Sequence, residues 1–176
     1  LNYAEQLQFK QRVVENALLH IGKLGKVRVL PTLGMDKPWA YRNKAEFPLT
    51  ERNGRIVAGF FAPRSHQVVE ITDCLLQHPK INIVLQRFLT VANQLKIPIY
   101  NERSGAGFLR HLLVRIAVTT GELMAVVVTT SSDIPRLTDL VQGLTAGIPE
   151  LTSLLLNVNS RRTNVILGPR WQVLYG

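Results

Sequence analysis

Basic residues at alternating positions of two strand-like segments are the first candidates for chemistry in this sequence. Within 108–118, His111 and Arg115 stand four residues apart, so a β-strand would project both side chains from one face. Arg42 and Lys44 are two residues apart in another such segment and share a face in the same way. Cationic side chains on one sheet face can hold the phosphates of a nucleic acid. The alternative is that each side chain snorkels at a sheet edge or pairs with a carboxylate.

Three further arginines extend this set. Arg110 precedes His111, and strand alternation assigns it to the opposite face, together with Leu112. Arg161 and Arg162 lie in a loop rich in asparagine, which can contact phosphates or splayed bases; a solvated turn is the equal alternative. The predicted nucleic-acid-binding residues are Arg42, Lys44, Arg110, His111, Arg115, Arg161 and Arg162.

The charge balance favours a polyanionic partner. The 176 residues include 21 Lys and Arg against 12 Asp and Glu, which gives a formal net charge of +9. Contacts between such residues and phosphates release counterions, which drives non-specific binding to nucleic acids. Solubility is the alternative explanation for the charge. Aromatic residues make up only 7% of the chain, and no paired aromatics mark a stacking platform for single strands.

The chain has a single cysteine, Cys74, which excludes an internal disulfide and favours a reducing cytoplasm. It is also the only candidate thiolate, although the neighbouring Asp73 disfavours that form by like-charge repulsion. A buried structural cysteine is the alternative. The four histidines lack metal-ligand spacing.

Two other functions are disfavoured. Residues 104–107 (Ser-Gly-Ala-Gly) resemble the start of a phosphate-binding loop, but a strand-like segment follows instead of a helix, so a flexible turn is favoured. No apolar run approaches the roughly 20 residues that a membrane-spanning helix needs, so we expect no membrane partner.

The elements expected around these residues alternate between helices and hairpins. Asn2 and Glu5 form a capping-box pattern at the start of a helix that Gly22 ends. The predicted strands are 27–30, 41–50, 55–62, 67–71, 108–118, 123–130, 151–157 and 163–167, and the later helices are 79–96 and one capped by Ser132 or Asp133. The sequence therefore predicts an α+β fold, with a largely antiparallel sheet of hairpins, about three helices packed on it and no internal domain boundary.

A series of short motifs runs in one order along nearly the whole chain. They are Leu1-Asn2-Tyr3 with Gln6-Leu7 and Lys10, Gly34-Met35 with Pro38, Tyr41-Arg42-Asn43-Lys44, Phe47-Pro48, Gly59-Phe60, His66, Asp73-Cys74, Arg110 to Arg115, Thr120 to Met124, Asn157 with Asn159, and Thr163 to Ile166 with Gly168. In this order they resemble the uracil-5 RNA methyltransferases, which make 5-methyluridine in ribosomal and transfer RNA. The branch that methylates large-subunit ribosomal RNA is the most similar.

This resemblance implies that residues 1–176 are the central RNA-recognition domain of a longer enzyme. It implies an upstream cysteine-rich segment, whose three cysteines would join Cys74 as ligands of a 4Fe-4S cluster. It also implies a downstream methyltransferase domain with the S-adenosylmethionine site, the cysteine nucleophile and the proton-abstracting carboxylate. On this basis we expect the chain to bind ribosomal RNA and the missing methyltransferase domain. We expect it to contain no catalytic or cofactor-binding residue, to hold no ordered cluster and to be inactive alone.

Two alternatives belong to other functional classes. The chain can be a stand-alone basic RNA-binding or scaffold module without catalysis. A small self-sufficient enzyme is disfavoured, because the sequence offers no pairing of a nucleophile with a base.

Overall fold

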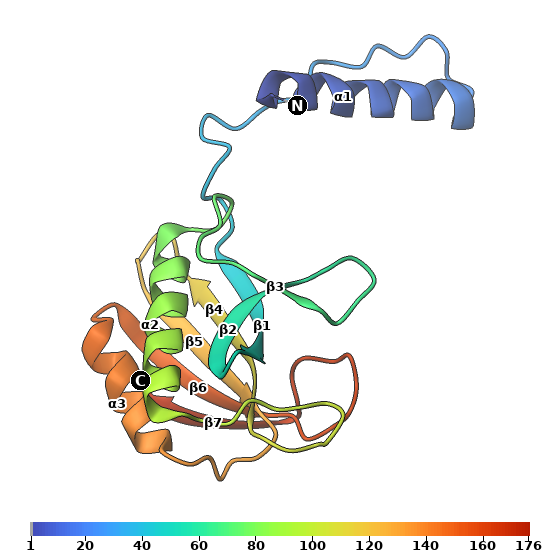
Figure 1. Cartoon of the computed structure of the whole chain (residues 1–176). Helices are drawn as coiled ribbons and strands as arrows, with labels where there is room; N and C mark the ends of the chain where they lie inside the picture. The colour runs from blue at the N-terminus through green and yellow to red at the C-terminus, as the bar shows by residue number, and fades with distance from the viewer. Residues whose placement is uncertain (1) are drawn as a thin grey trace. The chain divides into compact units, whose positions relative to one another are not determined.

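The computed structural model describes residues 2–176, which divide into two compact units (Figure 1). One comprises the residues up to Trp39, and the other runs from Ala40 to Gly176. The expectation of no internal boundary is therefore corrected. The reason is that the described helical residues of the first unit are all at least partly exposed and lead into an exposed segment rich in glycine and proline.

The first unit consists of a helix and an extended segment that contacts it. Helix α1 (Tyr3–Asn16) begins at the predicted capping box and continues into a π-helical turn, η1 (Ala17–Ile21), which ends at Gly22 as expected. The strand predicted at 27–30 is wrong: this segment pairs with no strand, and the carbonyl of Val29 accepts a bond from Gln11 of the helix. The Tyr3 hydroxyl likewise accepts the backbone N–H of Met35 at 2.8 Å.

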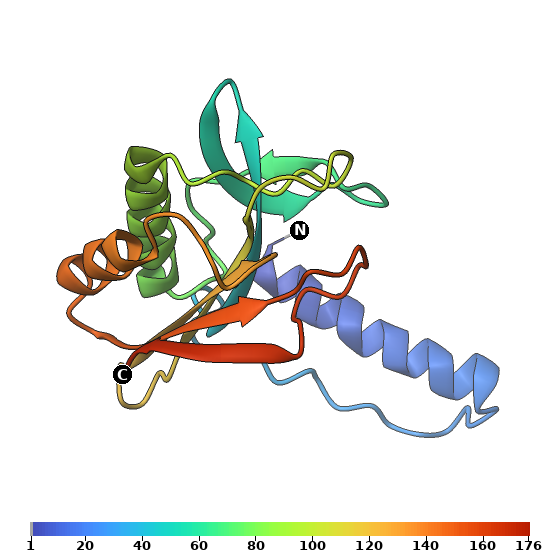
Figure 2. The same cartoon turned by 90° about the horizontal axis from the view of Figure 1, so that it is seen from below.

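The second unit is built on a seven-stranded sheet in the order β3-β2-β1-β4-β5-β6-β7 (Figures 1 and 2). Every neighbouring pair is antiparallel except β5 and β6. Helix α3 (Leu137–Gly147) connects these two parallel strands. The α+β class and the largely antiparallel sheet are thus confirmed. The strands are β1 (Lys44–Arg52), β2 (Arg55–Phe61), β3 (Val68–Glu70), β4 (Leu109–Ile116), β5 (Leu123–Thr129), β6 (Leu151–Val158) and β7 (Arg170–Tyr175).

Tight turns set the register of the hairpins. Asn53 and Gly54 both have positive φ angles, 53° and 72°, which the two central positions of a type I′ turn require. Arg52 and Arg55 consequently pair across the hairpin. The predicted hairpin between β4 and β5 also forms, with Ile116 opposite Leu123.

Helices α2 (Pro79–Leu95) and α3 (Leu137–Gly147) lie on the same face of the sheet (Figure 2). Of the three helices expected there, α1 belongs to the other unit. Pro79 occupies the first turn of α2, as predicted, whereas α3 follows Arg136 without a side-chain cap, so the expected cap at Ser132 or Asp133 is wrong. The core between helices and sheet includes Phe47, Ile81, Leu85, Phe88, Leu112, Leu140, Leu144 and Leu156.

The C-terminal part departs most from expectation. Residues 163–167 form no strand, because the side-chain amide of Asn159 binds the backbone carbonyls of Val165 and Ile166. The edge strand is instead β7, which pairs with β6 and leaves Trp171 and Val173 exposed. Among the described residues, none of the helices is both long enough and apolar enough for a bilayer span.

Candidate nucleic-acid interface

The sheet face opposite α2 and α3 carries several of the predicted residues. We call it the open face; its residues include Lys44, Glu46, His111, Leu113, Arg115, Val126 and Val128. They alternate with the core residues Phe47, Leu112, Val114 and Val127, which face the helices. Part of this face is covered, since Ile166 and Leu167 pack against Leu113, Val126 and Val128.

A cationic group lies at one end of the open face. Lys44 and Arg115 are direct partners across β1 and β4, and both are exposed. Arg42 is also exposed and precedes Lys44 by two residues, outside β1, where its backbone forms an isolated bridge with Gln77. Lys44 forms an ion pair with Glu46 at 2.6 Å, so for this residue the alternative of pairing with a carboxylate is the one observed. Arg42 and Arg115 form no ion pair within the described part of the chain and contribute full positive charges there.

Arg110 does not lie where strand alternation placed it. Leu109 pairs with Thr129 and His111 pairs with Val128, so Arg110 is the extra residue of a β-bulge. Its guanidinium therefore points away from the helix side and donates from Nη1 to the carbonyls of Asn159 (2.7 Å) and Arg161 (2.8 Å).

These bonds change the role of Arg110. The side chain is buried, and the guanidinium also lies 4.9 Å from the ring centroid of Tyr100, a cation–π contact. That Arg110 binds RNA phosphates stays a prediction; in the structure its Nη1 atom holds the backbone of a neighbouring loop.

That loop, residues 159–169, is called the arginine loop because it presents Arg161 and Arg162. Asn159 fastens it: the amide donates to the carbonyls of Val165 (2.6 Å) and Ile166 (3.0 Å) and accepts the Arg161 N–H (3.1 Å). At the other end of the loop, the Asn157 side-chain amide donates a hydrogen bond to the Gly168 carbonyl and accepts one from the Gly168 N–H. Both asparagines are buried, whereas Arg161 and Arg162 are exposed. The solvated turn considered from sequence is thus a fixed loop that displays two cations.

His111 shares the open face with Arg115, as predicted, but it is only 9% exposed. The pKa of His111 is lowered to about 4, mainly by burial and also by the charge of Arg110, against the opposing effects of Glu46 and Glu102. The imidazole is therefore neutral near pH 7. That His111 binds nucleic acid stays a prediction, and any such contact near pH 7 would be made by the neutral ring.

This pKa predicts a pH-dependent stability. The unfolded chain takes up a proton near pH 6.5 and the folded chain near 4, so stability is full above 6.5 and declines as the pH falls between these values. From about pH 7 to pH 5 we expect a loss of about 2 kcal/mol in the free energy of unfolding. Urea denaturation at the two pH values measures it. His111→Phe should remove this part of the dependence, and the exposed-histidine control His66→Gln should keep it; equal stability of the unaltered chain at both values would contradict a buried neutral His111.

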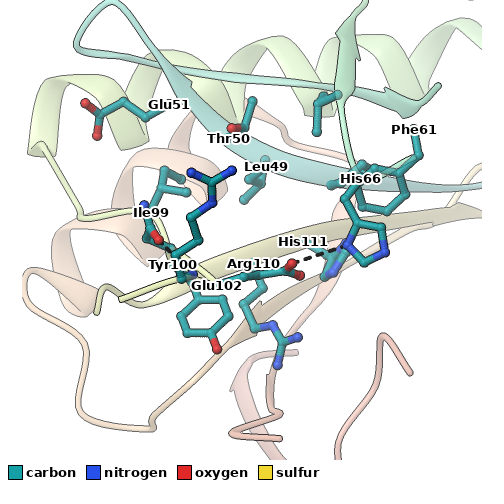
Figure 3. A pocket seen from close by; sticks show the side chains of 14 residues that line it. Leu49, Thr50, Glu51, Phe61, His66, Ile99, Tyr100, Glu102, Arg110 and His111 are labelled. Carbon is teal, nitrogen blue, oxygen red and sulfur yellow. Dashed lines mark hydrogen bonds and ion pairs between the residues drawn. The ribbon is translucent and has the colours of Figure 1, made fainter. Parts of the chain in front are cut away.

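Three loops, 62–67, 100–107 and the arginine loop, extend from the same side of the unit (Figures 1 and 2). A pocket of about 670 Å³ lies among the first two loops and the His111 end of the open face (Figure 3). A smaller one of about 220 Å³ adjoins it at the arginine loop. The pocket side chains that carry an aromatic ring or an ionisable group are Glu51, Phe61, His66, Tyr100, Glu102, Arg103, Arg110, His111 and Arg162.

Sequence reasoning missed most of these pocket residues. Tyr100 is far from Phe61 and His66 in the chain, and only the fold brings it close to them. A usable signal was present for Phe61 and His66, because each lies at or beside a predicted turn, where binding residues concentrate.

Cys74 is a free, partly buried thiol. Its backbone N–H donates to the Asp73 carboxylate at 2.8 Å, and Asn82 donates to the same oxygen. In the described residues no three His, Cys, Asp or Glu side chains are grouped to hold a metal ion. One thiol does not fit a 4Fe-4S cluster, which needs four cysteine ligands, so no chemical step is assigned to such a group.

The segment 104–107 behaves as the favoured turn. The Asn101 side chain accepts hydrogen bonds from the N–H groups of Arg103 and Ser104, and the Asn101 backbone carbonyl accepts one from the Gly105 N–H. With its N–H groups bonded inside the loop and a strand following it, the segment does not form a phosphate cradle.

Similar proteins are known over the whole chain. It is 40% identical to an uncharacterized RNA methyltransferase of Halalkalibacterium halodurans, 39% identical to one of Bacillus cereus and 40% identical to one of Listeria innocua, in each case over 176 residues. These alignments cover 100% of this chain and 38% of each relative, so the chain spans well under half the length of these proteins. No protein-family model matches the sequence.

A solved structure shares the fold. The crystal structure of the Pyrococcus abyssi tRNA (uracil-54, C5)-methyltransferase in complex with S-adenosyl-L-homocysteine superimposes with a TM-score of 0.72. The match covers 98% of this chain and 38% of that one, at 24% sequence identity. This likeness establishes a common fold for the matched region.

Proposed function

We propose that this chain is the substrate-RNA-binding central domain of an S-adenosylmethionine-dependent RNA (uracil-5-)-methyltransferase that forms 5-methyluridine in ribosomal RNA. The observation that carries the proposal is the 40% identity, over every residue of the chain, to proteins named RNA methyltransferases. The uracil-5 specificity is supported by the ordered motifs of the sequence and by the fold shared with a tRNA uracil-C5 methyltransferase. The preference for ribosomal RNA rests on the sequence resemblance alone.

The geometry supports a binding role. Arg42, Lys44 and Arg115 at one end of the open face, and Arg161 and Arg162 on the arginine loop, are exposed cations that we assign to phosphates. Arg110 acts as a positioning residue, since it bonds the backbone of the arginine loop.

The reaction itself needs groups that we place outside these residues. Methylation of uracil C5 requires a nucleophile at C6 and a base that later removes the C5 proton. Cys74 is the only thiol of the 176 residues. By resemblance we assign Cys74 to a cluster completed by cysteines elsewhere, and we assign catalysis to the remaining length of the protein.

The salt dependence of RNA binding tests the proposed role. We predict that the chain binds a structured ribosomal RNA hairpin and that the affinity falls roughly 100-fold between about 50 and 200 mM salt, as expected for about four phosphate contacts. Fluorescence anisotropy at the two salt concentrations measures this. Absence of binding, or binding that is insensitive to salt, contradicts the proposal. Methyl transfer to ribosomal RNA by the longer protein then separates it from a stand-alone binding module.

A further inference from the structure

The lining of the pocket beside His111 includes none of the residues assigned to phosphates above. It lies over the β1 and β2 end of the open face and has a volume of about 670 Å³, large enough for a small organic ligand. The adjoining pocket of about 220 Å³ shares His66, Tyr100, Glu102 and Arg110 with it, so the two form one continuous hollow.

Aromatic rings line this hollow. The Phe61 ring lies 5.6 Å from the His66 ring and 6.5 Å from the His111 ring, measured between centroids, and Phe61 is 45% exposed. Across the pocket, Tyr100 stacks on the guanidinium of Arg110 (Figure 3). An exposed ring such as that of Phe61 can stack on a nucleobase, whatever the base.

Polar groups able to meet a base edge lie beside the rings. The buried Nδ1 of His111 has no hydrogen-bond partner among residues 2–176, an uncommon state for a buried polar atom. The Glu102 carboxylate is 62% exposed, and His66 Nδ1 lies 3.2 Å from it. A carboxylate accepts hydrogen bonds from the amino groups of bases, and a neutral imidazole offers one donor and one acceptor.

Cations flank the same hollow. Arg103 lines the larger pocket and Arg162 the smaller one. The Nη2 atom of Arg162 lies only 2.5 Å from where a Cβ on Gly105 would be, so this side chain reaches from the arginine loop to the 100–107 loop. The hollow is therefore lined by rings, by base-edge groups and by the guanidinium groups of Arg103 and Arg162.

We propose that this hollow binds one unpaired nucleotide of single-stranded RNA, with the base against Phe61 and Tyr100 and the flanking phosphates on Arg103 and Arg162. The inference rests on the proposed RNA-binding function and adds a base pocket to it. A base must leave its helix to enter such a site. The domain would therefore favour RNA with splayed bases over a continuous duplex.

The test compares two RNAs and two aromatic substitutions in the full chain. The probes are a fluorescein-labelled single strand of about 12 nucleotides, long enough for one such site, and a blunt duplex of the same sequence. Phe61→Leu removes one aromatic ring from the pocket without changing the net charge of the chain. Trp171→Leu is the matched control, because Trp171 is 51% exposed on β7 and outside both pockets.

We expect Phe61→Leu to weaken single-strand binding about tenfold, the effect of one lost stacking contact, with duplex binding and the Trp171→Leu variant unchanged. Arg103→Gln, an exposed loop substitution that leaves Phe61 in place, should weaken single-strand binding more than Lys96→Gln does. Equal losses in pocket and control variants, or equal losses on both RNAs, would overturn the pocket while leaving the proposed function intact. Failure of the unaltered chain to bind either RNA overturns both.

Discussion

Replacing Asn159 by alanine is expected to lower the free energy of unfolding by about 3 kcal/mol, because three hydrogen bonds to loop backbone groups are lost at a buried site. The carbonyls of Val165 and Ile166 and the N–H of Arg161 would lose their partner. RNA affinity should fall as well, since the loop that presents Arg161 and Arg162 is no longer fixed. Urea denaturation and RNA titration of the same variant measure the two effects.

Asn164→Ala is the matched control for stability. Asn164 is an exposed asparagine of the same loop, and the side-chain bonds found in the described chain do not include it. We expect its unfolding free energy to stay within about 0.5 kcal/mol of the unaltered chain. If Asn159→Ala behaves like this control, the arginine loop is not held by Asn159.

Neutralising exposed arginines on the open face is expected to have the largest effect on RNA binding. The pair Arg42→Gln with Arg115→Gln should weaken binding on the order of 30-fold at about 50 mM salt, because two phosphate contacts are lost. The pair Arg161→Gln with Arg162→Gln should have a similar effect. Anisotropy titration with the ribosomal RNA hairpin measures both.

A control pair removes the same charge elsewhere. Lys80 at the start of α2 and Arg136 before α3 form ion pairs with Glu150 and Asp139 and belong to the helix side of the sheet. Lys80→Gln with Arg136→Gln should lower the affinity only slightly. Equal losses for the open-face and control pairs would mean that net charge, and not the open face, determines binding.

Local patterns in the sequence were sufficient for much of the fold. Asn53-Gly54 specifies its turn because both residues tolerate positive φ, and Pro79 with the apolar period after it specifies α2. Strand alternation also placed Lys44 and Arg115 on exposed positions, where the register makes them neighbours. These features depend on residues close together in the chain.

The features that sequence reasoning missed depend on long-range contacts. The bulge at Arg110 changes the direction of its side chain, and no local pattern marks it. Residues 163–167 have strand-like composition, but Asn159 binds two of their carbonyls and so replaces a sheet ladder. The pocket requires loops from three parts of the chain, and the neutral state of His111 follows from its burial among them.

The salt slope of RNA binding tests most directly whether the open face carries the RNA. Titrations over several salt concentrations give the slope of log affinity against log salt for each pair of substitutions. The Arg42→Gln and Arg115→Gln pair should reduce its magnitude by about 2, one for each lost phosphate contact, while the Lys80→Gln and Arg136→Gln pair leaves it unchanged. A slope that the first pair leaves intact, or that both pairs reduce equally, would contradict RNA binding at this face.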